Sequence, residues 1–355
     1  MRASVVIRSK DEADRLRLTL TSLACQTEPA QVVVVNDGSS DHTRAVIAEM
    51  QDSLDLAPIH HDRPAGRSGA ANAGASLATG DIVLFLDGDT LAAPDLVERH
   101  MEQHRQSPDL VVRGETFHLR CTRSFLDPET GTPQPGEEAR VARMSASELA
   151  KSCVTRDQIR TDFASVDKRG QGGIYPGFGP RKLFELEMQA LMSEPDNPVL
   201  WCAASGSNQS LAREAFLTSK GFHPDITINE HRELALRLCA GGLRMAGCTG
   251  RTYHMTHRSG WRDPLHEPEW EHIFYAAHPL PEVALMSVLW ESLSDQSSVP
   301  EAARIHDLAG LAAAAERCKG IVGRDAVRAA HLRHAARHAL VADRTAQVRD
   351  GDRQQ

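Results

Sequence analysis

The sequence predicts an α/β protein with a mostly parallel central sheet and helices on both of its faces. Over the first 116 residues, short runs rich in β-branched residues alternate with amphipathic segments of helical period. Polar and acidic residues follow directly after the predicted strands, where open α/β sheets bind their ligands. The 355 residues suffice for one large domain with an accessory part.

The predicted elements follow one another in a regular order. After the first strand, the segment EADRLRLTLTSLA places Leu16, Leu20 and Leu23 at helical spacing. Beyond the first half, we expect a strand, a helix, a second helix and another strand over 201–257, and mostly helices over 281–349. The strands of the first half are expected at 3–7, 31–36, 58–61, 81–86 and 110–114.

The order divides the chain into four predicted parts. Between the two halves of the α/β domain, the sequence turns to Pro, Gly and charged residues, so we expect long irregular loops there. The parts are the first half of the α/β domain (1–116), an insertion (117–200), the second half of that domain (201–260) and a helical C-terminal extension (261–355).

Composition narrows the class of protein. The net charge of −8 gives no general attraction for nucleic acid. The seven cysteines are scattered and never form CxxC, which disfavours a disulfide framework or a zinc site. The sequence shows neither a signal peptide nor a membrane span, so we expect a cytoplasmic protein. The C-terminal helices offer a surface for a homodimer.

Two carboxylates separated by one glycine follow a buried strand in DIVLFLDGDT. Asp87 and Asp89 would reach one spot at the edge of the sheet, where hard oxygen ligands suit Mg²⁺ or Mn²⁺. The alternative is an ordinary Asp-Gly turn. Asp37 follows a second strand in VVVVNDGSSDHT, with Ser39 or Asp41 as the cap of the next helix.

A third segment, RPAGRSGAANAGASLATGD, predicts a helix start that could bind phosphate oxygens. Other phosphate motifs are missing from the sequence: it has no GxxxxGK[ST], and no GxGxxG follows the first strand.

These motifs, together with SGSNQSLAREAFLTSKGF and NEHRELALRLCAGGLRM, resemble in order and spacing the inverting, nucleotide-sugar-dependent glycosyltransferases of the GT-A fold, family 2. The resemblance covers 3–116 and 201–257. It implies a GT-A fold followed by the helical extension, a UDP-sugar as donor, and Mn²⁺ or Mg²⁺ as cofactor. It also implies that 1–116 is the nucleotide-sugar-binding half and 201–260 the acceptor and catalytic half, with acceptor loops in the insertion at 117–200.

The resemblance also implies roles for individual residues. Asp89 would bind the cation together with Asp87 and His254, and His257 is a second choice to His254. Because Ala71 stands where many relatives have arginine, Arg67 or Arg63 would supply charge to the diphosphate. The donor would be contacted by Arg8, Ser9, Glu12, Asp37, Arg67, Asp87, Gly88 and Ser207.

The catalytic base is harder to assign. Relatives have a Glu-Asp pair before a helix, and INEHREL puts Glu230 and His231 at those two positions. We expect Glu230 to be the base because a carboxylate at a helix start can project into the cleft, and His231 is the alternative because it titrates near working pH. Glu233 is expected to pair with Arg237 on the exposed side of that helix.

The expected function is transfer of a hexose or N-acetylhexosamine, with a UDP-GlcNAc-like donor favoured, to a small acceptor. The acceptor could be an aminoaromatic natural-product precursor, free or on a carrier protein. One alternative is a non-catalytic nucleotide-sugar-binding protein. The other is a sugar nucleotidyltransferase, which is disfavoured because IRSKDEADR lacks the glycine-rich loop.

Overall fold

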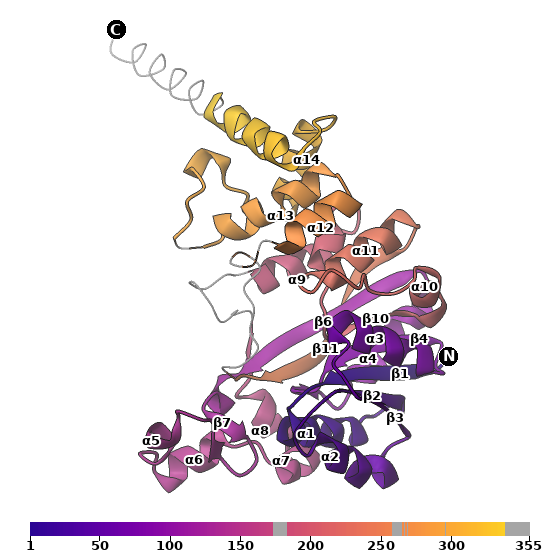
Figure 1. Ribbon diagram of the computed structural model, residues 1–355, viewed down its shortest axis with the longest axis vertical. Helices are drawn as coiled ribbons and strands as arrows, with labels where there is room; N and C mark the ends of the chain where they lie inside the picture. The colour runs from indigo at the N-terminus through magenta and orange to yellow at the C-terminus, as the bar shows by residue number, and fades with distance from the viewer. Residues whose placement is uncertain (173–182, 258–264, 266, 268, 295, 338–355) are drawn as a thin grey trace.

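One twisted sheet forms the centre of the molecule (Figure 1). The computed structural model describes residues 1–172, 183–257, 265, 267, 269–294 and 296–337. Within them the sheet has nine strands in the order β3-β2-β1-β4-β10-β6-β11-β5, with β9 beside β6. The strands are β1 (Ala3–Ser9), β2 (Gln31–Asp37), β3 (Leu56–His61), β4 (Ile82–Asp87), β5 (Thr90–Ala92), β6 (Leu110–Leu119), β9 (Gln171–Gly172), β10 (Gln209–Ala212) and β11 (Arg244–Met255).

The sheet is mostly parallel, as the sequence predicts. β1 pairs in parallel with β2 and β4, and β6 pairs in parallel with β11. β10 lies antiparallel between β4 and β6, so the second half of the chain completes the sheet of the first. The register sets Arg8 opposite Asp87, at the carboxyl ends of two neighbouring strands. The short strands β5 and β9 were not predicted.

Helices cover both faces of the sheet because the parallel strands β1, β2 and β4 are largely apolar on both sides. Val5 and Ile7 belong to the core under α1 (Ala13–Ala24), α2 (Thr43–Met50) and α4 (Leu96–Gln106). Val6, between them in sequence, faces the opposite core. That second core lies under α3 (Gly66–Leu77), α9 (Leu183–Ser193), α10 (Arg213–Thr218) and α11 (Glu230–Ala240).

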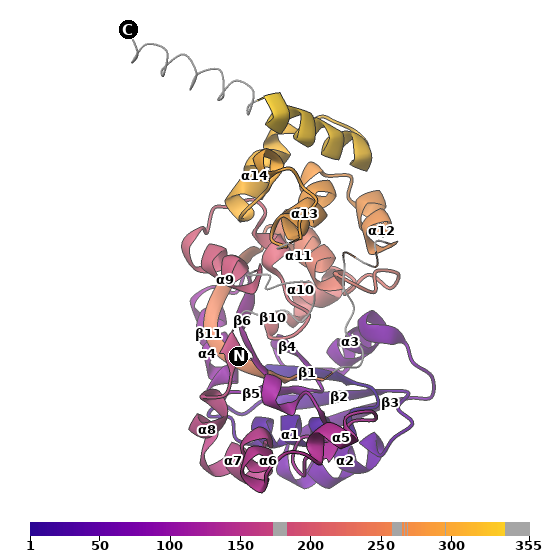
Figure 2. The ribbon, with the colours of Figure 1, turned by 90° about the vertical axis from the view of Figure 1, so that its left-hand side faces the viewer.

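The C-terminal helices continue this second layer away from the N-terminal strands (Figures 1 and 2). They are α12 (Glu269–Ala277), α13 (Pro281–Ser292), α14 (Leu308–Arg317) and a helix over 324–337. Phe274 and Trp290 belong to the same hydrophobic cluster as Trp201, whose ring lies 5.8 Å from that of Phe274. Within the described ranges, no helix combines the length and apolar character that crossing a bilayer requires.

The insertion is more regular than its composition suggests. It contains β7 (Phe125–Asp127), β8 (Thr132–Pro133), α5 (Glu138–Val141), α6 (Ala146–Ser152), α7 (Arg156–Thr161) and α8 (Phe163–Asp167), besides α9. Val154 and Ile159 pack with Leu119 and Tyr253 in a core of their own. The prediction of a largely irregular insertion is therefore wrong for these parts, while 173–182 lies outside the described residues.

Two buried histidines fix the start of β10. His104 Nε2 lies 2.8 Å from Ser210 Oγ, which lies 2.8 Å from His100 Nδ1. His100 Nε2 in turn lies 2.8 Å from Asn208 Oδ1, and Asn208 donates to the carbonyls of Glu115 and Gly250. Burial lowers the pKa of both histidines to about 4, so both imidazoles in this chain of hydrogen bonds are neutral at neutral pH.

We expect acid to destabilise the protein through this pair. Histidines titrate near pH 6.5 when unfolded, so their contribution is complete above about pH 6.5 and is lost as the pH falls toward about 4. The loss amounts to roughly 3 kcal/mol per histidine. Urea unfolding as a function of pH should show this slope, and His104→Gln should flatten it. His306→Gln, at an exposed site, should leave it unchanged.

Candidate active site

Arg8, at the end of β1, joins the two halves of the site. Its Nε donates to Asp87 Oδ1 at 2.8 Å, and its Nη1 donates to Glu230 Oε1 at 3.1 Å. Its Nη2 donates to the carbonyl of Gly206. The side chain is only 11% exposed. The charge of Arg8 therefore pairs with Asp87 and Glu230, and it links the first strands to the start of α11.

The turn that carries the two carboxylates is held from both sides. The amide of Gly88 donates to the carbonyl of Arg8, and Thr19 on α1 donates to the carbonyl of Gly88. A Cβ on Gly88 would lie 2.8 Å from Ser9 Oγ, so only glycine fits against the end of β1. Ser207 Oγ accepts from the amide of Asp87. The Asp-Gly-Asp segment is thus fixed against β1.

Asp89 meets two histidines. Its Oδ2 lies 3.1 Å from His254 Nε2 and 2.9 Å from His257 Nε2. One carboxylate oxygen and two imidazole nitrogens therefore converge within 4.8 Å of one another. Asp87 stands outside this trio, because its carboxylate pairs with Arg8 and its side chain is 38% exposed. The structure brings together His254, the first choice from the sequence, and His257, the second.

The electrostatics around Asp89 are those of a charged, partly buried centre. Burial alone would raise the pKa of Asp89, but His254 and His257 outweigh it and hold that pKa well below its usual range. Burial and the charges of Asp89 and Asp87 raise the pKa of Glu12 well above its usual value. Glu12 Oε1 lies 3.7 Å from His257 Nε2. A cation would relieve this concentration of carboxylates.

His118 lies behind His254. Its Nδ1 is 3.3 Å from His254 Nδ1, on the side of that ring turned away from Asp89. Burial and the nearby charge of His254 lower the pKa of His118 to about 4, so the His118 ring is neutral and can accept a hydrogen bond from His254 Nδ1. A partner on the second nitrogen is the usual way in which a metal-binding histidine is oriented.

Asp37 has partners within the protein. Its Oδ1 accepts from the amide of Ala65 at 2.7 Å and contacts His61 Nδ1 at 2.8 Å, while its Oδ2 accepts from the amide of Gly66 at 3.0 Å. Its carboxylate therefore holds the loop that starts α3. A base-binding role would require one of these oxygens to gain or exchange a partner.

Glu230 and His231 begin α11, and their environments differ. Burial would raise the pKa of Glu230, but the His231 ring and the charges of Arg8 and Arg67 hold it far below its usual range, so Glu230 is ionised. His231 Nε2 accepts from Arg232 Nη1 at 2.8 Å, because an arginine can only donate. No nitrogen of His231 is left as an acceptor for substrate, which favours Glu230 over His231 as the proton acceptor.

Two expectations about neighbouring residues need correction. Glu233 does pair with Arg237, at 2.7 Å, but it lies on the buried side of α11 and also contacts His278, the residue that follows α12. The segment around Trp201, expected to be a strand, is a 3-10 helix over Leu200–Ala203. That helix forms because its side chains all turn into the core shared with the C-terminal helices.

Gly206 lies between the charged groups. A Cβ there would lie 2.9 Å from Arg8 Nη2 and 3.2 Å from His231 Nδ1. We expect Gly206→Ala to fold normally, since the flexible end of Arg8 can move, and to lose about tenfold in kcat because Arg8 and Glu230 would shift. Gly241→Ala, at the end of α11 where φ is −82°, is the matched control. Equal kcat for both variants would contradict this packing.

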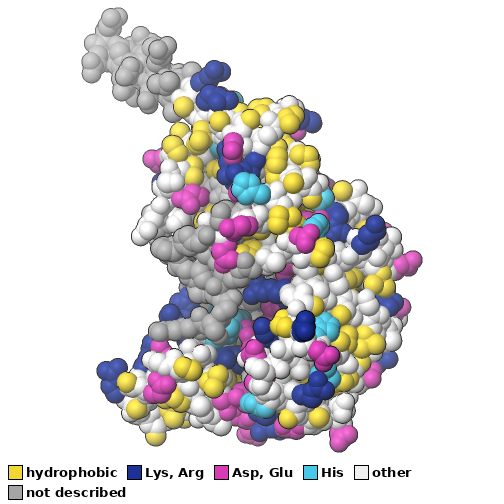
Figure 3. All heavy atoms as spheres, viewed as in Figure 1, with side chains coloured by type: hydrophobic (Ala, Val, Ile, Leu, Met, Phe, Trp, Pro, Cys, Tyr) yellow, Lys and Arg dark blue, Asp and Glu magenta, His cyan; other side chains and the backbone are white. Residues whose placement is uncertain are grey.

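The surface reflects this arrangement (Figure 3). In the middle of the face shown, between the C-terminal helices above and the sheet below, basic, acidic and histidine side chains lie side by side.

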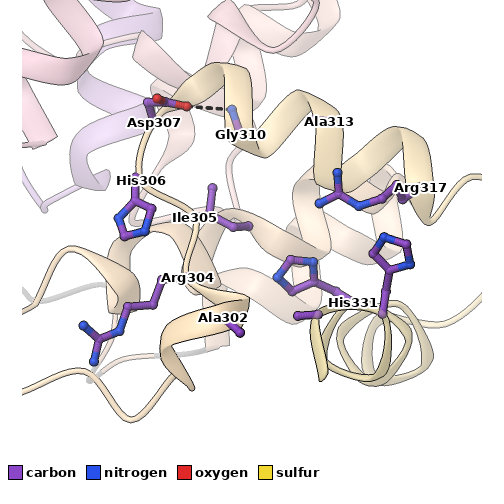
Figure 4. Close-up of a pocket in the computed structure, with 11 residues that line it drawn as sticks. Ala302, Arg304, Ile305, His306, Asp307, Gly310, Ala313, Arg317 and His331 are labelled. Carbon is purple, nitrogen blue, oxygen red and sulfur yellow. Dashed lines mark hydrogen bonds between the residues drawn. The ribbon is translucent and has the colours of Figure 1, made fainter. Parts of the chain in front are cut away.

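A separate pocket of about 480 Å³ lies in the C-terminal extension (Figure 4). Arg304, Arg317 and His331 line it, and it belongs to the contact between α14 and the helix over 324–337.

Comparison with known proteins identifies the family. The family model described as "Glycosyl transferase family 2" matches residues 4–132. Residues 4–132 therefore form a domain of this family. The structure is also similar to the crystal structure of Staphylococcus aureus TarS 1–349, with a TM-score of 0.51. The sequence identity is 15%, and the match covers 88% of this chain and 70% of that one. This likeness is one of fold. The GT-A fold that the sequence predicts is confirmed.

Several curated proteins are similar in sequence. The validoxylamine A glucosyltransferase of Streptomyces hygroscopicus subsp. jinggangensis is 38% identical over 257 residues, covering 68% of this chain and 52% of that protein. The poly-beta-1,6-N-acetyl-D-glucosamine synthase of S. aureus (strain MSSA476) is 31% identical over 117 residues, covering 33% and 28%. The chain thus spans about half or less of these relatives.

The sequence located most of the residues that meet at this site and missed those behind it. His61, His118 and Glu187 lie in none of the motifs, and Arg232 lies within NEHREL but was given no role. His61 contacts Asp37 and His118 contacts His254 across the fold. Arg232 contacts its sequence neighbour His231, and Glu187 reaches the site only through Arg232.

Proposed function

We propose that this family 2 chain is an inverting, metal-dependent glycosyltransferase that moves a hexose or N-acetylhexosamine from a UDP-sugar to a small-molecule acceptor. The observation that carries the proposal is the trio of Asp89, His254 and His257 beside Asp87 at the carboxyl edge of the sheet. Relatives named for glucosyl transfer to validoxylamine A and for poly-N-acetylglucosamine synthesis support the sugar class.

The donor would lie along the strand ends. Asp89, His254 and His257 fit Mn²⁺ better than Mg²⁺, because two of the three donor atoms are imidazole nitrogens. Bound there, the cation would neutralise charge on the departing diphosphate without any proton transfer. Asp87 would contact the ribose, with Ser9 and Asp37 toward the base. Arg67, at the start of α3, would lie against the phosphates.

The acceptor would lose its proton to Glu230. An ionised carboxylate can take that proton as the acceptor oxygen or nitrogen attacks the anomeric carbon, by the logic that gives inverting glycosidases a carboxylate base. Arg8 holds Glu230 in place and links it to Asp87. Because attack comes from the face opposite the leaving UDP, the product has inverted configuration.

The donor can be found before the acceptor is known. A panel of UDP-sugars with Mn²⁺ should raise the melting temperature, and the true donor should raise it most, because a ligand that binds only the folded state stabilises it. Removing the metal with a chelator should abolish both this shift and UDP release. Mn²⁺ should restore them at a lower concentration than Mg²⁺.

The assay also separates this function from a protein that only binds nucleotide-sugars. Such a protein would show the Mn²⁺-dependent shift but no UDP release with any acceptor. An aminoaromatic compound, free or on a carrier protein, belongs in the acceptor panel alongside aminocyclitols. The latter follow from the name of the validoxylamine A relative.

A further inference from the structure

A buried network of arginines and a glutamate lies behind the start of α11. Arg232 donates through Nε to the carbonyl of Cys202 at 2.7 Å and through Nη1 to Asn229 Oδ1 and His231 Nε2, both at 2.8 Å. Its Nη2 donates to Glu187 Oε1 at 2.7 Å. These contacts fix the guanidinium plane in one orientation.

Glu187, on α9, orients that arginine. Its side chain is 3% exposed, and its second oxygen accepts from Arg113 of β6 at 2.5 Å. Burial would raise the pKa of Glu187, but Arg113 and Arg232 outweigh it and lower that pKa. An ionised glutamate between two arginines is a buried charge that is both paired and hydrogen-bonded, the condition under which such a charge is tolerated in the core.

The orientation of Arg232 determines where His231 carries its proton. Since Arg232 donates to Nε2, the neutral ring must be protonated at Nδ1. Nδ1 lies 3.7 Å from Glu230 Oε2, longer than a hydrogen bond, and has no hydrogen-bond partner among the described residues. Burial lowers the pKa of His231. The positive charges of Arg232 and Arg8 lower this pKa further, whereas Glu230 raises it. The Nδ1–H faces the carboxylate of Glu230.

We propose that Glu187 is a positioning residue, which acts through Arg232 to hold His231 as the neutral Nδ1–H tautomer. In this tautomer His231 presents an N–H to the ionised carboxylate of Glu230 and takes no proton from the acceptor. This inference rests on the proposed function, because it assigns the base role to Glu230 alone. It also gives a reason why histidine can stand where relatives have an aspartate: the Nδ1–H places a partial positive charge beside the Glu230 carboxylate, where an aspartate would place a second negative charge.

The network also connects the C-terminal extension to the site. The guanidinium carbon of Arg232 lies 5.1 Å from the centre of the Trp290 ring, on α13. A cation over an aromatic face is stabilised, and more so when buried. Trp290 therefore closes the side of Arg232 that its hydrogen bonds leave uncovered. The extension supports the orientation on which His231 depends.

The tautomer can be observed directly. In protein labelled with nitrogen-15 histidine, long-range proton–nitrogen spectra distinguish rings protonated at Nδ1 from those protonated at Nε2, and His231→Gln identifies the signal of His231. At neutral pH we expect the Nδ1–H pattern, lost in Arg232→Met, which has no donor for Nε2. An Nε2–H or a doubly protonated ring in the unmodified protein would overturn the proposal. This measurement does not depend on turnover, so it stands apart from any failure of the proposed function.

Kinetics then test the role of Glu187. Glu187→Gln should lower kcat by about tenfold or more and change the KM for the UDP-sugar by less than about twofold, because the donor does not touch this network. Glu185→Gln, exposed on the same helix, is the matched control and should keep wild-type kcat. A folded Glu187→Gln protein with the kcat of the control, or with a raised KM alone, would show that Glu187 is only structural.

Discussion

Replacing Asp89 with asparagine should reduce turnover by roughly a thousandfold or more while the protein still folds. Asparagine keeps the size of the side chain and can still accept from Thr90, but it removes the negative charge between His254 and His257. Without that charge the cation would be held by two imidazoles alone, and the diphosphate would depart without its compensating charge. UDP release with Mn²⁺ is the measurement.

The control for this variant is an exposed aspartate. Asp52→Asn, in the short 3-10 helix Gln51–Ser53, should keep full turnover. Both proteins should unfold at similar urea concentrations and show the same far-ultraviolet circular dichroism. Wild-type turnover by a folded Asp89→Asn protein would exclude the proposed metal site.

Glu230→Gln should lower kcat by roughly 10²- to 10⁴-fold, the usual contribution of a general base. Glutamine fills the same space and can still accept from Arg8, so binding of the UDP-sugar should change little. The loss should therefore fall on kcat and leave the donor KM near its wild-type value. Glu214→Gln, exposed on α10, serves as the control.

This variant also decides between the two candidates for the base. If His231 were the base, Glu230→Gln would lose far less activity than His231→Gln. The structure predicts the opposite order, because Arg232 occupies the Nε2 lone pair of His231.

The polar residues at the strand ends could be predicted because consecutive residues determine both the strand and the side chains that follow it. An apolar run followed by Asp-Gly-Asp gives both the buried strand β4 and the position of Asp87 and Asp89 at its end. Parallel neighbours bring Arg8 and Asp37 to the same edge of the sheet. The family resemblance then placed Glu230 and His254 nearby, and both lie where these motifs meet.

The partners of these residues could not be predicted from the sequence. His254 and His257 are three residues apart, a spacing that would put them on opposite faces of a strand. Both reach Asp89 because β11 ends at Met255 and the chain turns there. Arg113, Glu187 and Arg232 are separated by 74 and 45 positions and meet only when α9 and α11 pack on β6. Asp37 likewise finds its partners in the loop before α3.

Pulsed electron paramagnetic resonance of the protein with Mn²⁺ and UDP tests the central claim most directly. If Asp89, His254 and His257 hold a cation that binds the diphosphate, the Mn²⁺ signal should show coupling to imidazole nitrogen and to phosphorus in the same complex. The nitrogen coupling should weaken in His254→Gln and in His257→Gln. Phosphorus coupling without any nitrogen coupling would mean that the metal is bound only by the nucleotide, and would contradict the account.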